Sequence, residues 1–251
     1  MTIRVYLAGQ VAVECGDVVI RDADLGGRQS RLLLACLVLA DGRPVRKSEL
    51  AEILWPDGPP PSWEVSVAAL ASKLRAQLGR GALPRGVIDG ALGSYQLSLP
   101  PDSWVDVREV AANVYQAEGA LLRGDVRAAA PHALIAASIS RRGFLPEDTG
   151  EWVERIRGQL VAQRMRALEI LAESLLGSGD HARAVTAASD VLELDPYRET
   201  GYQLLMRAHA AAGNRAEALL VYERCRRLLS GELGIDPSPS TEAVYLAILR
   251  S

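Results

Sequence analysis

Basic side chains recur along three consecutive helical segments in the first third of this 251-residue chain. Arginine and lysine suit phosphate oxygens, because charge-assisted hydrogen bonds to phosphate are short and strong. Hydroxyl and aromatic residues accompany them on the third segment and suit contacts to a nucleic-acid backbone. We therefore predict a DNA-contacting set of nine residues: Arg28, Arg31, Arg46, Lys47, Trp63, Ser66, Ser72, Lys73 and Arg75.

The third segment, residues 62–78, must position five of these nine side chains. Its apolar residues recur at a helical spacing of i, i+4, i+7 and i+11: Val67, Ala71, Leu74 and Leu78. This period predicts one amphipathic helix, with Ser62 as its N-cap and Gly79 as its stop. If the protein binds DNA, this helix is the element that enters the major groove.

The face opposite that apolar stripe has little capacity to hydrogen-bond a base. Four of its six residues are apolar: Val65, Ala68, Ala69 and Ala76. A candidate face for a partner protein comprises Val65, Ala68, Ala69 and Leu70. Alanine and valine offer only apolar contact to thymine methyl groups, whereas direct readout uses arginine, asparagine or glutamine. Two interpretations stay open at this point, weak base readout and docking of a partner protein.

The elements around this helix follow a recognisable order. Residues 3–20 form short alternating runs that predict a small antiparallel sheet. Apolar periodicity predicts helices over 28–40 and 47–55, and two extended pieces around the loop 90–93 predict a hairpin. Strands, three helices and a terminal hairpin predict a winged helix-turn-helix domain over residues 1–102.

Residues 103–251 predict an all-α array, so that the whole chain is mostly helical. The dipeptides at 179–180 and 213–214 open similar helices 34 residues apart, with alanines at matching positions. A 34-residue repeat of paired helices is typical of tetratricopeptide-like arrays. Asp195 and Pro196 predict the start of the helix between them, as N-cap and first residue.

Charge and hydropathy limit the class of partner. Residues 1–104 hold 11 basic and 11 acidic residues, and the chain as a whole has a net charge of −3. Because phosphate neutralisation supplies most non-specific affinity, we expect weak DNA binding with a modest salt dependence. Asp89, on the predicted hairpin, adds a carboxylate that would repel phosphate. The longest apolar run, residues 32–40, is too short to span a bilayer.

Nothing in the sequence predicts an enzyme, a metal or a cofactor. The three histidines stand alone, and the chain has no GxxxxGK[ST], GxSxG or HExxH motif. Three cysteines without a CxxC pair indicate buried thiols in a reducing compartment. The N-terminus lacks the features of a signal peptide. We therefore expect a cytoplasmic protein with no membrane association.

Five motifs in order carry a resemblance over nearly the whole chain: GGRQSRLLLACLVLADGRPV, SELAEILWPDGPPP, SKLRAQLG, SYQL and AEALLVYERCRRLLSGELGIDPSPS. The chain resembles the Streptomyces antibiotic regulatory protein family. Members of that family join an OmpR-type winged helix to a bacterial transcriptional activator domain of tetratricopeptide-like helices. Lys73 and Arg75 match the family's SRLR signature as SKLR.

The resemblance implies a DNA-binding transcriptional regulator, a pathway-specific activator of a biosynthetic gene cluster. Such a protein binds direct repeats in a promoter, as tandem copies or as a homodimer, and contacts RNA polymerase. The alternative is a degenerate relative that no longer recognises DNA and acts as a protein-interaction module.

Overall fold

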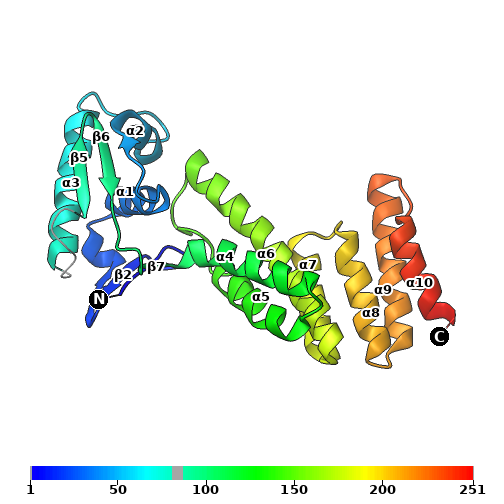
Figure 1. Cartoon of the computed structure of the whole chain (residues 1–251). Coiled ribbons are helices and arrows are strands. Elements are labelled where there is room, and N and C mark those ends of the chain that lie inside the picture. Colours follow the sequence, from blue (N-terminus) through cyan, green and yellow to red (C-terminus); the bar gives the residue numbers. More distant parts are fainter. Residues whose placement is uncertain (1, 81–86, 251) are drawn as a thin grey trace. The chain divides into compact units, whose positions relative to one another are not determined.

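The computed structural model describes residues 2–80 and 87–250. They form two compact units (Figure 1). The first comprises the residues up to Glu109 together with Arg142–Leu160, and the second comprises Val110–Arg141 with Val161 onward. The domain boundary at residue 102 stays a prediction. The structure adds that residues 142–160, far beyond that boundary, pack with the N-terminal residues.

A four-stranded sheet with the order β3-β2-β1-β7 forms one part of the first unit. Its strands are β1 (Ile3–Tyr6), β2 (Ala12–Cys15), β3 (Val18–Arg21) and β7 (Trp104–Val105). The antiparallel pairing of β1, β2 and β3 confirms the sheet predicted over residues 3–20. Strand β7 was not predicted; it runs parallel to β1, with Trp104 opposite Arg4. Two residues are too short a run to show an alternating pattern.

Three helices and a second sheet complete the winged helix-turn-helix. The elements are η1 (Asp22–Leu25), α1 (Arg28–Leu39), β4 (Val45–Arg46), α2 (Lys47–Leu54), α3 (Trp63–Arg80), β5 (Ile88–Ala91) and β6 (Ser94–Leu97). Helix α1 is the centre of this unit, because seven consecutive residues of it, 32–38, are buried and it packs on both α2 and α3. The second sheet has the order β4-β6-β5.

The predicted apolar stripe of α3 is confirmed, since its four residues are the buried residues of the helix. The predicted stop at Gly79 is wrong: the helix continues to Arg80, and Gly79 does not adopt the left-handed conformation that ends helices. The hairpin loop is shorter than predicted. Leu92 and Gly93 form the turn, both with positive φ, as in the two-residue turns whose twist fits antiparallel strands.

The second unit is an array of helix pairs. It contains α4 (Asp106–Leu122) from Val110 onward and α6 (Glu151–Ser178) from Val161 onward. Its other elements are α5 (Val126–Ser140), α7 (His181–Leu194), α8 (Glu199–Ala211), α9 (Arg215–Leu228), the π-helical turn η2 (Leu229–Leu233) and α10 (Pro239–Arg250). Helices α7, α8 and α9 pack in succession, as the 34-residue offset predicts. Ala184 and Ala218, 34 positions apart, are both fully buried.

The predicted start of the helix at Asp195 and Pro196 is wrong, because α8 begins at Glu199. The Asp195 carboxylate instead accepts a hydrogen bond from the Tyr197 N–H, which stabilises a turn before the helix. The predicted fold class, a winged helix-turn-helix followed by a helical array, is confirmed. No helix in the described ranges has the length and apolar character needed to cross a membrane.

Candidate nucleic-acid interface

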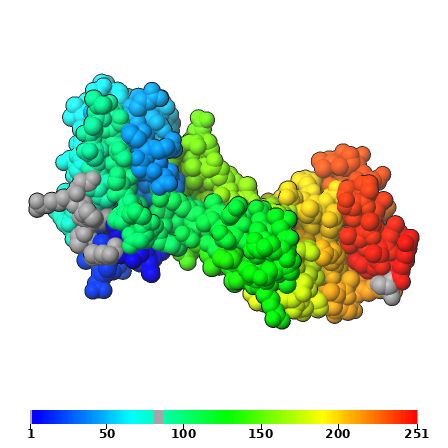
Figure 2. Space-filling view, in the orientation of Figure 1, coloured from blue at the N-terminus to red at the C-terminus, as the bar shows by residue number. Residues whose placement is uncertain are grey.

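Helices α2 and α3 meet the β5–β6 hairpin at Tyr95. The Lys47 Nζ lies 5.8 Å from the centre of the Tyr95 ring, and the Arg75 guanidinium carbon lies 5.6 Å from it. Both distances suit a cation–π interaction. The Arg75 Nε also donates a hydrogen bond of 2.8 Å to the Ile88 carbonyl. Arg75 therefore fastens the third helix to the hairpin, and the two lie side by side in Figure 2.

Strand pairing brings a third cation to this point. Strand β4 pairs with β6 so that Arg46 lies opposite Ser94, and the Lys47 N–H donates to the Gly93 carbonyl at 3.0 Å. Arg46 is exposed beside the hairpin turn. We call Arg46, Lys47, Arg75 and Tyr95 the wing cluster. In the part of the chain that the structure describes, none of its three cations has a carboxylate within 4.0 Å.

Gly90 makes the packing of the wing cluster possible. A Cβ atom at this position would lie 2.8 Å from the Tyr95 Cε1 and 3.2 Å from the Arg75 Nη2. Contacts that short require the ring or the guanidinium to move. Gly90 is therefore required for the packing of the hairpin. Asp89, directly before it, has an exposed carboxylate.

The exposed face of α3 is the one the sequence indicated. Val65 is 71% exposed, Ala69 and Ser72 are exposed, and Ala68 and Leu70 are half-buried. Because most of these side chains cannot hydrogen-bond, the surface that α3 offers to a base edge is largely apolar.

Lys73 is the basic residue on that face, and it is held near the start of α1. Its Nζ donates to the Gly26 carbonyl at 3.1 Å, and Gly26 has a φ of +79°. Trp63 and Ser66, in the first turn of α3, are half-buried, and the Ser66 hydroxyl donates to the Ser62 carbonyl. Lys73 therefore keeps an exposed charge although one of its hydrogen bonds is used within the chain.

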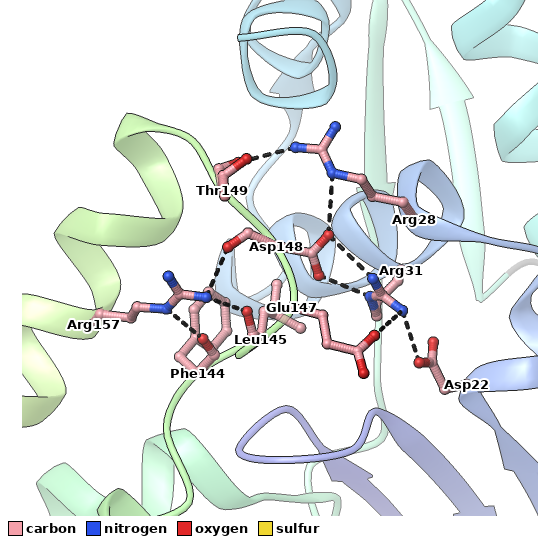
Figure 3. Close-up of polar contacts among 9 residues, drawn as sticks. All are labelled: Asp22, Arg28, Arg31, Phe144, Leu145, Glu147, Asp148, Thr149 and Arg157. Carbon is pink, nitrogen blue, oxygen red and sulfur yellow. Dashed lines mark hydrogen bonds and ion pairs between the residues drawn. The ribbon is translucent and has the colours of Figure 1, made fainter.

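Arg28 and Arg31 bind Asp148 (Figure 3). The Arg31 Nε donates to the Asp148 carboxylate at 2.8 Å, and its Nη1 donates to Asp22 at 2.7 Å. The Arg28 Nε lies 3.3 Å from Asp148, whose side chain is fully buried. Hydrogen bonding to Asp148 raises the pKa of Arg31 above its usual value. These two arginines thus already have an anionic partner.

The segment that supplies Asp148 is anchored in the first unit by its backbone. The Arg157 Nε donates to the Phe144 carbonyl at 2.9 Å, and its Nη2 donates to the Asp148 carbonyl at 2.8 Å. Phe144 is fully buried and forms an antiparallel bridge with Ala8. The sequence did not predict this contact, because Asp148 lies within the region predicted as a helical array and no local pattern identifies its partner.

Nucleophilic and metal-binding chemistry is limited in the described parts of the chain. His132 pairs with Asn113 at 2.8 Å, and no group of three potential metal ligands occurs among the described residues. The three cysteines are buried. Burial raises the pKa of the Cys36 thiol to about 12 and that of Cys225 to about 11, so both stay protonated at neutral pH.

Comparison with known proteins identifies the helical region. Residues 105–249 match the model of the bacterial transcriptional activator domain. The chain belongs to this family. It is 32% identical over 226 residues to the regulatory protein AfsR of Streptomyces coelicolor, covering 90% of this chain and 22% of AfsR. It is 33% identical over 229 residues to the transcriptional regulatory protein EmbR of Mycobacterium tuberculosis, covering 90% of this chain and 58% of EmbR.

A solved structure of Mycobacterium tuberculosis EmbR, in complex with a low-affinity phosphopeptide, has the same fold. It aligns with a TM-score of 0.88 at 27% identity, over 99% of this chain and 65% of that one. The resemblance to the Streptomyces antibiotic regulatory proteins is thereby confirmed. The chain spans about a fifth of the length of AfsR and less than two thirds of that of EmbR.

Within this member of the bacterial transcriptional activator domain family, the structure brings together only some of the predicted contact residues. Lys47 and Arg75 converge on Tyr95, and Arg46 lies opposite the neighbouring Ser94. Tyr95 itself was not predicted as a functional residue, although it lies in the SYQL motif that marks the end of the hairpin. In β6, Tyr95 and Leu97 are buried, whereas Ser94 and Gln96 are half-buried. This alternation places the Tyr95 ring on the inner face of the strand.

Proposed function

We propose that this chain is a DNA-binding transcriptional activator that places α3 in the major groove and the wing cluster on the adjacent phosphates. The observation that carries this proposal is the convergence of Arg46, Lys47 and Arg75 where two helices and a hairpin meet, without a neutralising carboxylate. The relatives, which are named as regulatory proteins, support the same role. The protein-interaction module that does not recognise DNA is not favoured.

The chemistry of α3 defines how DNA would be recognised. Phosphate contacts from Arg46, Lys47, Lys73 and Arg75 set the position, with Trp63, Ser66 and Ser72 beside them. Val65 and Ala69 contact thymine methyl groups, and the shape of the site supplies the remaining selectivity. Arg28 and Arg31 contribute little to phosphate binding in this proposal, because Asp148 and Asp22 together neutralise them.

The wider role follows from the family. We infer that the protein binds direct repeats in the promoter of a biosynthetic gene cluster, as tandem copies or as a homodimer. Its helical array contacts RNA polymerase or another protein of the transcription machinery. In this role it acts in the cytoplasm, has no catalytic activity, and requires no cofactor.

A carboxylate placed on the exposed face of α3 tests the proposal. Ala69 is exposed in mid-helix, so Ala69→Asp leaves the fold intact and directs a negative charge at the DNA. Fluorescence anisotropy with the upstream region of the gene and with a scrambled duplex measures the affinity. We expect Ala69→Asp to weaken binding to the upstream region at least tenfold.

Ala111→Asp is the matched control, since Ala111 is also exposed in mid-helix but lies on α4. It should bind like the unaltered protein. Equal loss in both variants, or unchanged binding by Ala69→Asp, would exclude α3 as the DNA-contacting helix. Equal affinity of the unaltered protein for the two duplexes would exclude specific recognition by this chain alone.

A further inference from the structure

A cavity of about 290 Å³ lies among α5, α6 and α7 of the second unit. Its floor is apolar and includes Leu168 and Leu171 of α6, both buried. Three arginines line the cavity: Arg141 directly after the end of α5, Arg164 on α6 and Arg183 on α7. Apolar walls with a few convergent polar groups are the usual construction of a small-ligand site.

Two of the three arginines of this cavity differ from those arginines of the same array that form ion pairs. Arg198, Arg207 and Arg226 each form an ion pair with a glutamate at 2.7–2.9 Å. Within the described residues, Arg141 and Arg164 have no carboxylate within 4.0 Å. Arginine–glutamate ion pairs therefore occur in this array, but Arg141 and Arg164 form none within the described residues.

Arg164 also leaves a buried donor unused. Its Nε is inaccessible to solvent and has no hydrogen-bond partner among the residues that the structure describes. A buried N–H without an acceptor is unfavourable, and an arginine does not lose a proton to relieve it. The side chain must turn toward the cavity before this N–H can reach an oxygen of a bound anion. The planar fork of a guanidinium suits the two oxygens of a carboxylate or phosphate.

The remaining charges of the cavity favour an anion as well. Arg183 has its carboxylate partner, Asp180, only at 3.4 Å, in an exposed pair. Asp190 is the one carboxylate that lines the cavity, against three guanidinium groups. The surplus of positive charge lies directly above an apolar floor, so the complementary ligand carries both an acidic group and an apolar body.

We propose that the cavity bounded by Arg141, Arg164 and Arg183 binds a small amphipathic acid, an apolar body bearing one carboxylate, phosphate or sulfonate group. The acidic group pairs with Arg141 and Arg164, and the apolar body lies on Leu168 and Leu171. The small volume favours a free small molecule over a segment of a partner protein. This site is separate from the proposed DNA-contacting surface, which lies in the first unit.

Two fluorescent dyes with nearly the same apolar body test the proposal on the full chain. The probe is 8-anilinonaphthalene-1-sulfonate, and the neutral control is N-phenyl-1-naphthylamine, which lacks the sulfonate. We expect the double substitution Arg141→Gln with Arg164→Gln to raise the Kd of the sulfonate at least tenfold. The Kd of the neutral dye should change less than twofold, because glutamine retains the apolar floor.

The double substitution Arg123→Gln with Arg227→Gln is the matched control, since both arginines are exposed on the same array outside the cavity. It should leave both dyes unaffected, and circular dichroism checks that both double variants remain helical. An equal loss of sulfonate binding in the two double variants would reduce the effect to general surface charge and overturn the proposal. So would unchanged sulfonate binding after Arg141 and Arg164 are replaced.

Competition identifies the kind of ligand. We expect phenylacetate to displace the sulfonate dye and the neutral phenylacetamide to leave it bound, because the two differ in charge at nearly equal size. Displacement by an acidic hexapeptide, with none by phenylacetate, would overturn the assignment to a small molecule and indicate a protein partner.

Discussion

Two groups of basic residues in the first unit show how differently the same side chain can be used. Arg28 and Arg31 converge on a buried carboxylate, whereas Arg46, Lys47 and Arg75 converge on an aromatic ring or an exposed strand end. A cation bound to a carboxylate must give up that partner before it can bind phosphate. A cation beside an aromatic ring keeps its charge available. Basic residue type alone therefore does not define a DNA-contacting surface.

The two groups also differ in what they stabilise. Arg31 is 12% exposed and pairs with a fully buried Asp148, so this contact holds the segment Arg142–Gly150 in the first unit. Breaking a buried ion pair by removing one partner is strongly destabilising, because the other charge remains buried. The wing cluster, by contrast, shapes a surface. The first group should thus respond to mutation mainly in stability, and the second mainly in DNA affinity.

The largest effect is expected from Asp148→Asn, which removes the shared carboxylate with almost no change of volume. It leaves Arg31 with only Asp22 and the weak contact with Glu147, and should lower the free energy of unfolding by about 3 kcal/mol. Urea denaturation followed by circular dichroism measures the change.

Glu147→Gln is the control. Glu147 is exposed and lies 4.0 Å from Arg31, so the loss of its charge should cost less than about 0.5 kcal/mol. Equal effects of the two substitutions would contradict the role assigned to Asp148.

Gly90→Ala should have the second largest effect, through the wing cluster. The added methyl group would meet the Tyr95 ring at 2.8 Å and should destabilise the protein by about 2 kcal/mol. DNA affinity should fall with it, because Arg75 and Tyr95 must move apart. Anisotropy and urea denaturation measure the two quantities.

Gly79→Ala provides a control of opposite sign. Gly79 lies within α3, and a Cβ there meets no atom within 4 Å among the described residues beyond its own helical turn. Alanine should therefore stabilise the helix by about 0.5–1 kcal/mol without changing the wing cluster. If Gly90→Ala were as well tolerated as Gly79→Ala, the packing of Gly90 against Tyr95 would not matter.

The sequence predicted those parts of the fold that depend on local periodicity. The buried stripe of α3 and the 34-residue spacing of α7 and α9 follow from apolar residues at regular intervals. Strand β7 was not predicted, and the start of α8 was predicted wrongly. The first depends on pairing with β1 about 100 residues away, and the second on a turn that Asp195 stabilises instead of capping the helix.

The candidate site was predictable as a set of residue types, but not as a geometry. Arg31 and Arg75 are both arginines on helices, and nothing near either in the sequence indicates that one binds Asp148 and the other Tyr95. Asp148 lies 117 residues after Arg31. Such partners are determined by tertiary packing, which a periodic pattern does not contain.

Acid should weaken the ion pairs of the helical array, and Glu169 is the clearest case. Burial alone would raise the pKa of Glu169, but hydrogen bonds from Arg198 and Thr200 lower it below its usual value. The stability it contributes is present above the usual glutamate pKa and is lost as pH falls through the lower folded value. Glu169→Gln should cost about 1.5 kcal/mol at pH 7, and the difference from the unaltered protein should shrink as pH falls below the usual glutamate pKa and through the lower folded value.

Urea denaturation at a series of pH values measures this difference. Glu193→Gln is the control, because Glu193 is exposed in the same array and forms no ion pair within the described residues. It should shift the unfolding free energy little at any pH. A difference for Glu169→Gln that persisted unchanged at low pH would show that the charge of Glu169 is not what stabilises the array.

The smallest effect is expected on the salt dependence of DNA binding, which compares the two groups of basic residues most directly. Each phosphate neutralised by the protein contributes about −0.9 to the slope of log K against log salt concentration. Arg46→Gln should therefore make the slope shallower by about 1 and reduce the affinity several-fold at low salt. Arg28→Gln should leave the slope unchanged, because Asp148 already neutralises Arg28. Anisotropy titrations over a range of salt concentrations give both slopes.

If Arg28→Gln made the slope as shallow as Arg46→Gln does, DNA would have to release Arg28 from Asp148 on binding. The two groups of basic residues would then form one continuous phosphate-binding surface.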